Sequence, residues 1–109
     1  MKVIILPEVY DYFEELVETL YQREYFGFRD SSFNYVVGLV EEIENNLSKL
    51  QHKRATKHFD RYGKGIFYAS FRKNKQTEWY AFFTKYNENG NTFYLVRHIE
   101  NNHTAAQYL

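Results

Sequence analysis

Arg97 and His98 are neighbours near the end of one apolar, aromatic-rich segment, and Arg72 stands near the end of another. A histidine with an unperturbed pKa of about 6.5 can both accept and donate a proton near neutral pH. An arginine fixed beside a phosphate stabilises negative charge that develops there during a reaction. These three residues are therefore the catalytic candidates. A hydrogen-bonded or exposed histidine, and arginines that pair with carboxylates, would leave the same pattern.

A strongly basic stretch covers residues 53–75, where eight Lys and Arg accompany one acidic residue, Asp60. Such a local field attracts polyanions even though the whole chain has a net charge of zero. Interleaved His and Tyr can stack on unpaired bases, which favours single-stranded RNA over duplex DNA. The alternative is a solvated loop followed by an edge strand that lysines protect from aggregation. We expect substrate to be bound by Lys53, Arg54, Lys57, His58, Arg61 and Lys73.

Several kinds of site lack their signatures. The chain has no Cys, which excludes disulfides, thiolate zinc sites and cysteine nucleophiles. Its four histidines show no helical i, i+4 pair, and the sequence has no phosphate-binding loop, dinucleotide-binding glycine turn or Gly-x-Ser-x-Gly elbow. We therefore expect neither a metal nor a cofactor.

The length of 109 residues, with 44% hydrophobic and 20% aromatic residues, predicts one folded domain over residues 1–109. No stretch is apolar for long enough to span a membrane, and the apolar run at residues 3–6 is too short for a signal peptide. We expect a soluble, cytoplasmic protein.

Hydrophobic periodicity predicts the elements that would position these side chains. Ser31 and Ser32 are the expected cap of the second helix, Asn101 and Asn102 are expected caps of a final one, and Asn89-Gly90 is a hairpin turn signal. The inner stripe of the second helix is predicted to be Phe33, Val36, Val37, Val40, Ile43, Leu47 and Leu50. The elements are a strand over residues 2–6, a helix over 8–24, a break at 25–28, a helix over 33–50, a basic loop over 52–64 with room for a helical turn, strands over 66–73, 78–86 and 92–99, and a short helix within 103–109.

This order, β-α-α-β-β-β, predicts an α+β fold: an N-terminal strand and a helical hairpin packed on a mostly antiparallel four-stranded sheet, with a short C-terminal helix. The helices would cover one face and leave the other free. Alternation along the first meander strand points Phe67, Ala69 and Phe71 toward the helices. Arg72 and His98 then lie on the free face, and Arg97 points the opposite way unless a bulge intervenes.

Together with this order of elements, three runs carry a family resemblance that spans nearly the whole chain. They are Lys-His-Phe-Asp-Arg-Tyr-Gly at 57–63, Thr-Glu-Trp-Tyr-Ala-Phe-Phe at 77–83, and Val-Arg-His-Ile-Glu-Asn-Asn-His-Thr-Ala-Ala-Gln-Tyr-Leu at 96–109. The chain resembles bacterial toxins of the RelE/ParE superfamily, in which two helices pack on an antiparallel sheet. The resemblance implies a cognate antitoxin protein as partner.

The RelE-like branch cleaves mRNA in the ribosomal A site without a metal, by attack of a ribose 2′-OH on the adjacent phosphate. The resemblance then implies that Arg72 and Arg97 stabilise the charge on phosphorus, that His98 is the acid or base, and that Lys53, Arg54, Lys57 and Arg61 hold the RNA backbone. The ParE-like branch instead poisons DNA gyrase. A small RNA-binding module without catalysis is the third hypothesis, and we rank the ribosome-dependent endoribonuclease first.

Overall fold

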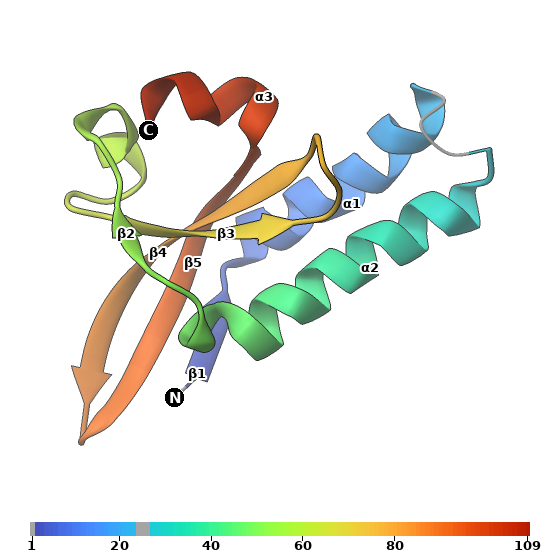
Figure 1. Ribbon diagram of the computed structural model, residues 1–109. Coiled ribbons are helices and arrows are strands. Elements are labelled where there is room, and N and C mark those ends of the chain that lie inside the picture. The colour runs from blue at the N-terminus through green and yellow to red at the C-terminus, as the bar shows by residue number, and fades with distance from the viewer. Residues whose placement is uncertain (1, 24–26) are drawn as a thin grey trace.

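A helical hairpin and a five-stranded sheet make up most of the protein in the computed structural model, which describes residues 2–23 and 27–109 (Figure 1). The predicted α+β class is confirmed. The elements of the described residues are β1 (Lys2–Ile5), α1 (Pro7–Gln22), α2 (Arg29–Asn46), η1 (Leu47–Lys49), β2 (Lys53–Arg54), η2 (Lys57–Tyr62), β3 (Phe67–Arg72), β4 (Glu78–Glu88), β5 (Asn91–Asn101), α3 (Asn102–Ala105) and η3 (Ala106–Tyr108), where η marks a 3₁₀ helix.

The strand order is β1-β5-β4-β3-β2, with β1 parallel to β5 and every other pair antiparallel. The predicted count of four strands is wrong, because β2 lies inside the stretch interpreted as a loop. Its two residues, Lys53 and Arg54, pair with Tyr68 and Phe67 of β3. Two residues are too few to show alternation, so only the pairing with β3 identifies this strand.

The helical hairpin covers one face of the sheet, which we call the helix face (Figure 1). The amphipathic pattern of each helix turns its apolar side onto Ala69, Phe71, Ala81, Phe83 and Val96 of the central strands. The helix-facing direction predicted for Ala69 and Phe71 is confirmed, and Phe67 packs partly buried against the same core. The residues contributed by the helices are Val9, Phe13 and Leu16 of α1 and Val36, Leu39 and Ile43 of α2.

The start of α2 differs from the prediction. The helix begins at Arg29, and its N-cap residue, Phe28, makes no side-chain cap bond. Ser32 is fully buried, and its hydroxyl donates to the carbonyl of Val17 at 2.5 Å, which ties α2 to α1. The predicted Ser31-Ser32 cap is therefore wrong, because burial between the helices gives that hydroxyl a different acceptor. The last predicted residue of the first helix, Glu24, and residues 25 and 26 of the predicted break lie outside the described residues.

The predicted inner stripe of α2 is only partly correct. Val36, Ile43 and Leu47 are buried as expected. Leu39, which the predicted stripe leaves out, is also fully buried, whereas Val37 and Val40 are only half-buried. Phe33 is 54% exposed, and Leu50 is also exposed. The apolar arc of α2 is wider than the surface the sheet offers, so its outer edge faces the neighbouring helix and solvent instead.

The predicted free face of the sheet is covered in part, around Phe82, and we call it the loop face. A second hydrophobic cluster forms there around Phe82 of β4, with Phe59 of η2 and Ala105 of α3 lying over it. The rings of Phe59 and Phe82 stack with centroids 4.5 Å apart, and both side chains are fully buried. Because β4 is aromatic on both faces, each face needs a cover, and η2 and α3 provide the second one.

The predicted turn and one of the two predicted helix caps are confirmed at the ends of β5. Asn89 and Gly90 have φ of 51° and 82°, the pair of positive values that joins β4 to β5 in a tight hairpin. At the other end, the side chain of Asn101 accepts from the backbone N–H groups of His103 and Thr104 and caps α3. No helix of the described residues is long and apolar enough to cross a membrane.

Candidate active site

A β-bulge in β5 brings Arg97 and His98 to the same face. Phe82 of β4 pairs with His98, but the next residue, Phe83, pairs with Val96, so Arg97 is the extra residue. A bulge of this kind changes the direction of a side chain without ending the strand. The side chain of Arg97 thereby reaches Thr84 on the loop face, where its Nε donates to the threonine hydroxyl at 3.1 Å. The conflict expected from strict alternation is resolved by this bulge.

His98 is held on its face and on its edge. The ring of Tyr62, the last residue of η2, lies on the imidazole with centroids 3.7 Å apart and 8° between the planes. Nε2 of His98 lies 2.6 Å from Oε1 of Glu100. Because a carboxylate can only accept, Nε2 carries the proton and Nδ1 is the acceptor nitrogen in the neutral ring. The side chains of His98 and Glu100 are 21% and 17% exposed.

The pKa of His98 lies below its ordinary value of 6.5. Burial is the largest cause, because it disfavours the charged ring, and the positive charge of Arg61 acts in the same direction. The hydrogen bond and the charge of Glu100 oppose this shift. The balance leaves a largely neutral imidazole at pH 7, which is the state that a general base requires.

A cavity of about 390 Å³ adjoins His98. Arg61, Tyr62, Arg97 and His98 line it together with Leu6, Ile99 and the first turns of α1, which include Glu8 and Tyr12. Neither arginine forms an ion pair with any residue that the structure describes. Burial, followed by the charge of Glu100, raises the pKa of Tyr12, so its phenol keeps its proton. The cavity thus combines two cations and one acidic residue, Glu8, with a neutral imidazole and a protonated phenol.

A buried side chain and a backbone conformation bring η2 to this cavity. Phe59 anchors the middle of η2 in the loop-face cluster. Gly63 ends η2 with φ of 156°, a conformation that favours glycine, and a Cβ there would already lie 3.5 Å from Cδ of Arg97. The Phe59 anchor and the contact of Gly63 with β5 together hold Tyr62 on His98 and Arg61 at the cavity.

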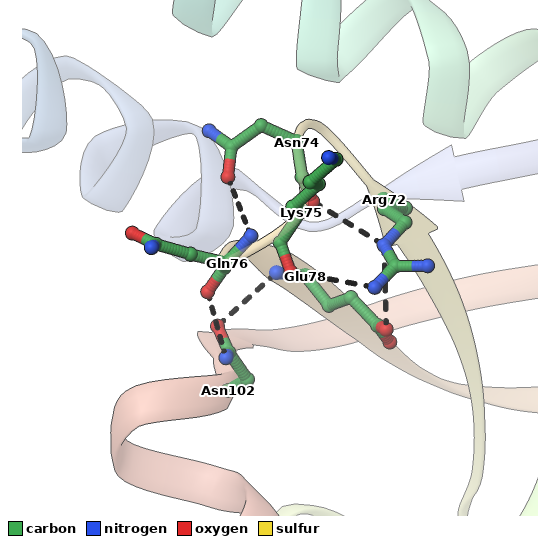
Figure 2. A network of polar contacts seen from close by, with 6 residues as sticks. All are labelled: Arg72, Asn74, Lys75, Gln76, Glu78 and Asn102. Atoms are coloured by element: carbon green, nitrogen blue, oxygen red, sulfur yellow. Dashed lines mark hydrogen bonds and ion pairs between the residues drawn. The ribbon is translucent and has the colours of Figure 1, made fainter.

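The structure does not bring Arg72 to this group. Phe82 pairs with His98 and with Tyr68, whereas Arg72 lies four residues further along β3. Standard sheet spacings put the two backbones about 16 Å apart. Arg72 instead belongs to the β3–β4 turn, where its guanidinium donates to the carbonyls of Asn74 and Lys75 and lies 4.0 Å from Glu78 (Figure 2).

The predicted substrate-binding residues divide into three groups. Arg61 lines the cavity, and Lys57 and His58 lie in the same exposed 3₁₀ helix, where His58 stacks on Tyr108 at 3.6 Å. Lys53 and Arg54 lie on the edge strand β2, away from the cavity. Lys73 points to the helix face and forms an ion pair with Glu42 of α2 at 3.2 Å.

Three residues that surround His98 are not among the predicted site residues: Glu100, Tyr62 and Tyr12. Glu100 had a signal, since a residue two positions along a strand lies on the same face. Tyr62 appears in the basic stretch, but nothing local to it indicates a partner in β5. Tyr12 carries no signal, because an aromatic residue on an amphipathic helix usually belongs to the core.

No metal-binding cluster of three or more His, Asp or Glu occurs in residues 2–23 and 27–109. No protein-family model matches the chain, and no curated protein or solved structure matches it significantly.

Proposed function

We propose that this protein is an endoribonuclease that cleaves single-stranded RNA by attack of a ribose 2′-OH on the adjacent phosphate. The observation that carries the proposal is the arrangement around His98: a neutral imidazole bonded to Glu100, in a cavity lined by Arg61 and Arg97, which form no ion pair with the residues that the structure describes. This combination supplies a base and charge stabilisation from side chains alone.

Each group has a distinct role in the proposed reaction. Nδ1 of His98 accepts the proton of the 2′-OH, whose oxygen bonds to phosphorus, and Glu100 stabilises the imidazolium that results. Arg61 and Arg97 balance the charge that grows on the phosphate oxygens. The bond from phosphorus to the 5′ oxygen breaks, and that oxygen takes a proton from the phenol of Tyr12 or from water. The products are a 2′,3′-cyclic phosphate and a 5′-hydroxyl.

The basic surface favours a polyanionic substrate. Of the eight Lys and Arg in residues 53–75, only Arg72 and Lys73 form ion pairs with residues described by the structure. Arg61 lines the cavity and Lys57 is exposed at the start of the same 3₁₀ helix, so both are available to hold the RNA backbone. By the resemblance to RelE-like toxins, we propose that the substrate is mRNA on the ribosome, that translation is inhibited in the cytoplasm, and that a cognate antitoxin restrains the protein.

The test is cleavage of mRNA in a bacterial translation extract, with and without ribosomes, mapped by primer extension. Wild-type protein and the control His103→Gln, at an exposed histidine of α3, should give new mRNA ends that require ribosomes. His98→Gln should give none while its thermal unfolding stays cooperative.

Three other results would contradict the proposal in different ways. Ends that persist in His98→Gln would remove His98 from the reaction. Intact mRNA with inhibited gyrase supercoiling would identify a ParE-like gyrase poison. Intact mRNA with salt-sensitive RNA binding would identify a binding module without catalysis.

A further inference from the structure

An apolar groove of about 340 Å³ runs between the two helices of the hairpin. All of its lining residues belong to α1 and α2, which lie side by side in Figure 1, and none lines the cavity beside His98. The apolar side chains that line it are Phe13, Val17, Phe33, Val36, Val37 and Val40. The groove therefore arises from the outer edge of the apolar arc of α2, the part that the sheet does not cover.

Exposed aromatic side chains gather around this groove. Phe33 and Tyr10 line it and are 54% and 42% exposed. A single exposed aromatic residue is ordinary, but an apolar groove with exposed rings at its border is typical of an interaction surface.

The charge around the groove is negative. Within the bounds of α1 and α2 there are nine Asp and Glu but one basic residue, Arg29, which already pairs with Glu18 at 2.6 Å. Glu14, Glu41 and Glu44 line the groove itself. This charge repels RNA, and it also repels the same face of a second copy of the chain. The complementary occupant carries Lys and Arg beside its apolar residues.

The shape of the groove fits a helix. On α2 the lining runs from Phe33 to Glu44, about 16 Å along the axis, which is three helical turns. The walls are themselves helices, whose backbone groups are already bonded within each helix. An extended segment would find no backbone partners there, whereas a helix satisfies its own backbone and can lay an apolar stripe between the two walls.

We propose that the groove between α1 and α2 binds an amphipathic helix of a partner protein, with an apolar stripe flanked by Lys and Arg. The inference goes beyond the proposed nuclease activity, because it uses no residue of the candidate active site. Apolar anchors would enter between Phe33 and Val40, and the flanking cations would lie near Glu41 and Glu44.

The test uses three synthetic helical peptides of about 18 residues. The first has Leu at positions i, i+3, i+4 and i+7 and Lys elsewhere, the second is a scrambled sequence of the same composition, and the third has Glu in place of Lys. Binding to the full chain is measured by fluorescence anisotropy, and the surface is mapped by amide chemical shifts. Only the first peptide should bind, with shifts that centre on Phe33 and Val40.

Variants of the chain then test the groove itself. Phe33→Ser, at an already exposed position, and the double variant Glu41→Lys/Glu44→Lys should each weaken binding by about tenfold or more. The matched controls Tyr108→Ser and Glu88→Lys, at exposed positions outside the groove, should change it less than about twofold. Equal binding of the scrambled or acidic peptide, unchanged binding by Phe33→Ser, or self-association through this face would overturn the proposal. None of these results depends on RNA cleavage, so the two proposals fail separately.

Discussion

The ring of Tyr62 lies flat on the imidazole of His98, with 3.7 Å between centroids, while Nε2 of the same imidazole bonds to Glu100 at 2.6 Å. The stack removes one face of His98 from water, and the hydrogen bond fixes its rotation. The last turn of η2 therefore controls the solvation of the histidine, although η2 is more than thirty positions away in the sequence, and Glu100 controls its orientation.

Replacing Tyr62 separates the stack from the hydroxyl. Tyr62→Phe keeps an aromatic ring on His98, so we expect the pKa of His98 to stay below 6.5 and cleavage to change little. Tyr62→Leu leaves the imidazole wetter and freer to turn, so we expect the pKa to rise toward 6.5 and cleavage to fall by about tenfold. Titration of the His98 ring by NMR, beside mRNA cleavage assays, checks both. If Tyr62→Phe lowered cleavage as much as Tyr62→Leu is expected to, the hydroxyl of Tyr62 and not its stacked ring would support the reaction.

Removing the charge of Glu100 should lower the pKa of His98 further. Glu100 is the group that opposes burial, through its hydrogen bond and its negative charge. In Glu100→Gln the amide oxygen can still accept from Nε2, but the charge is gone. A base must be neutral to act, so cleavage by wild type should rise with pH through the His98 pKa, and in this variant that rise should occur at lower pH. A shift of the rise to higher pH would contradict the assignment of His98 as base.

His98 should also make stability depend on pH. Its folded pKa lies below the unfolded value of 6.5, so the unfolded chain binds the proton more readily between those two values. The stabilisation is fully present above pH 6.5 and is lost as pH falls through the folded pKa. Urea unfolding at a series of pH values from 8 to 4 measures this slope. His98→Gln should show a shallower loss over that window, whereas an identical slope would mean that His98 is not titrating as its burial indicates.

The sequence was sufficient for the parts of the fold that repeat along the chain. The apolar periodicity of α1, the alternation Phe67, Ala69, Phe71 and the Asn89-Gly90 turn each depend on near neighbours, and each is confirmed. The unpredicted strand, β2, and the cover over the loop face instead depend on contacts between residues that are distant in the sequence. Nothing near Lys53 indicates β3 as partner, and nothing near Phe59 indicates that its ring stacks on Phe82.

The candidate site divides in the same way. Arg97 and His98 could be selected by residue type, and the proviso of a bulge proved necessary, because Arg97 is the extra residue of β5. Arg72 was selected on the same grounds, yet a register read from one strand gives no position relative to a strand two places away. Glu100 was within reach of simple alternation, while Tyr62 required the tertiary position of η2.

The positions of Arg97 and Arg72 therefore predict opposite effects of their substitution on cleavage. Arg97 lines the cavity, so Arg97→Ala should lower cleavage by about a hundredfold through loss of charge stabilisation. Arg72→Ala should leave cleavage within about twofold of wild type, because Arg72 only ties the β3–β4 turn (Figure 2). Single-turnover cleavage with saturating protein compares the two variants at matched folding. If Arg72→Ala lost most of its cleavage activity while Arg97→Ala cleaved normally, the reaction would have to take place near the β3–β4 turn and not at the cavity beside His98.

Phe59 tests whether the loop-face cluster holds the site together. Its ring is fully buried against Phe82, so Phe59→Ala should lower the free energy of unfolding by about 3–4 kcal/mol, measured in urea. The cavity it leaves loosens η2, and since η2 carries Arg61 and Tyr62, the pKa of His98 should rise toward 6.5 in the variant that remains folded. His58→Ala, next in sequence but exposed, removes a stack on Tyr108 and should leave that pKa unchanged. If Phe59→Ala destabilised the protein without moving the His98 pKa, Gly63 and the backbone after η2, rather than the buried ring, would be what positions Tyr62.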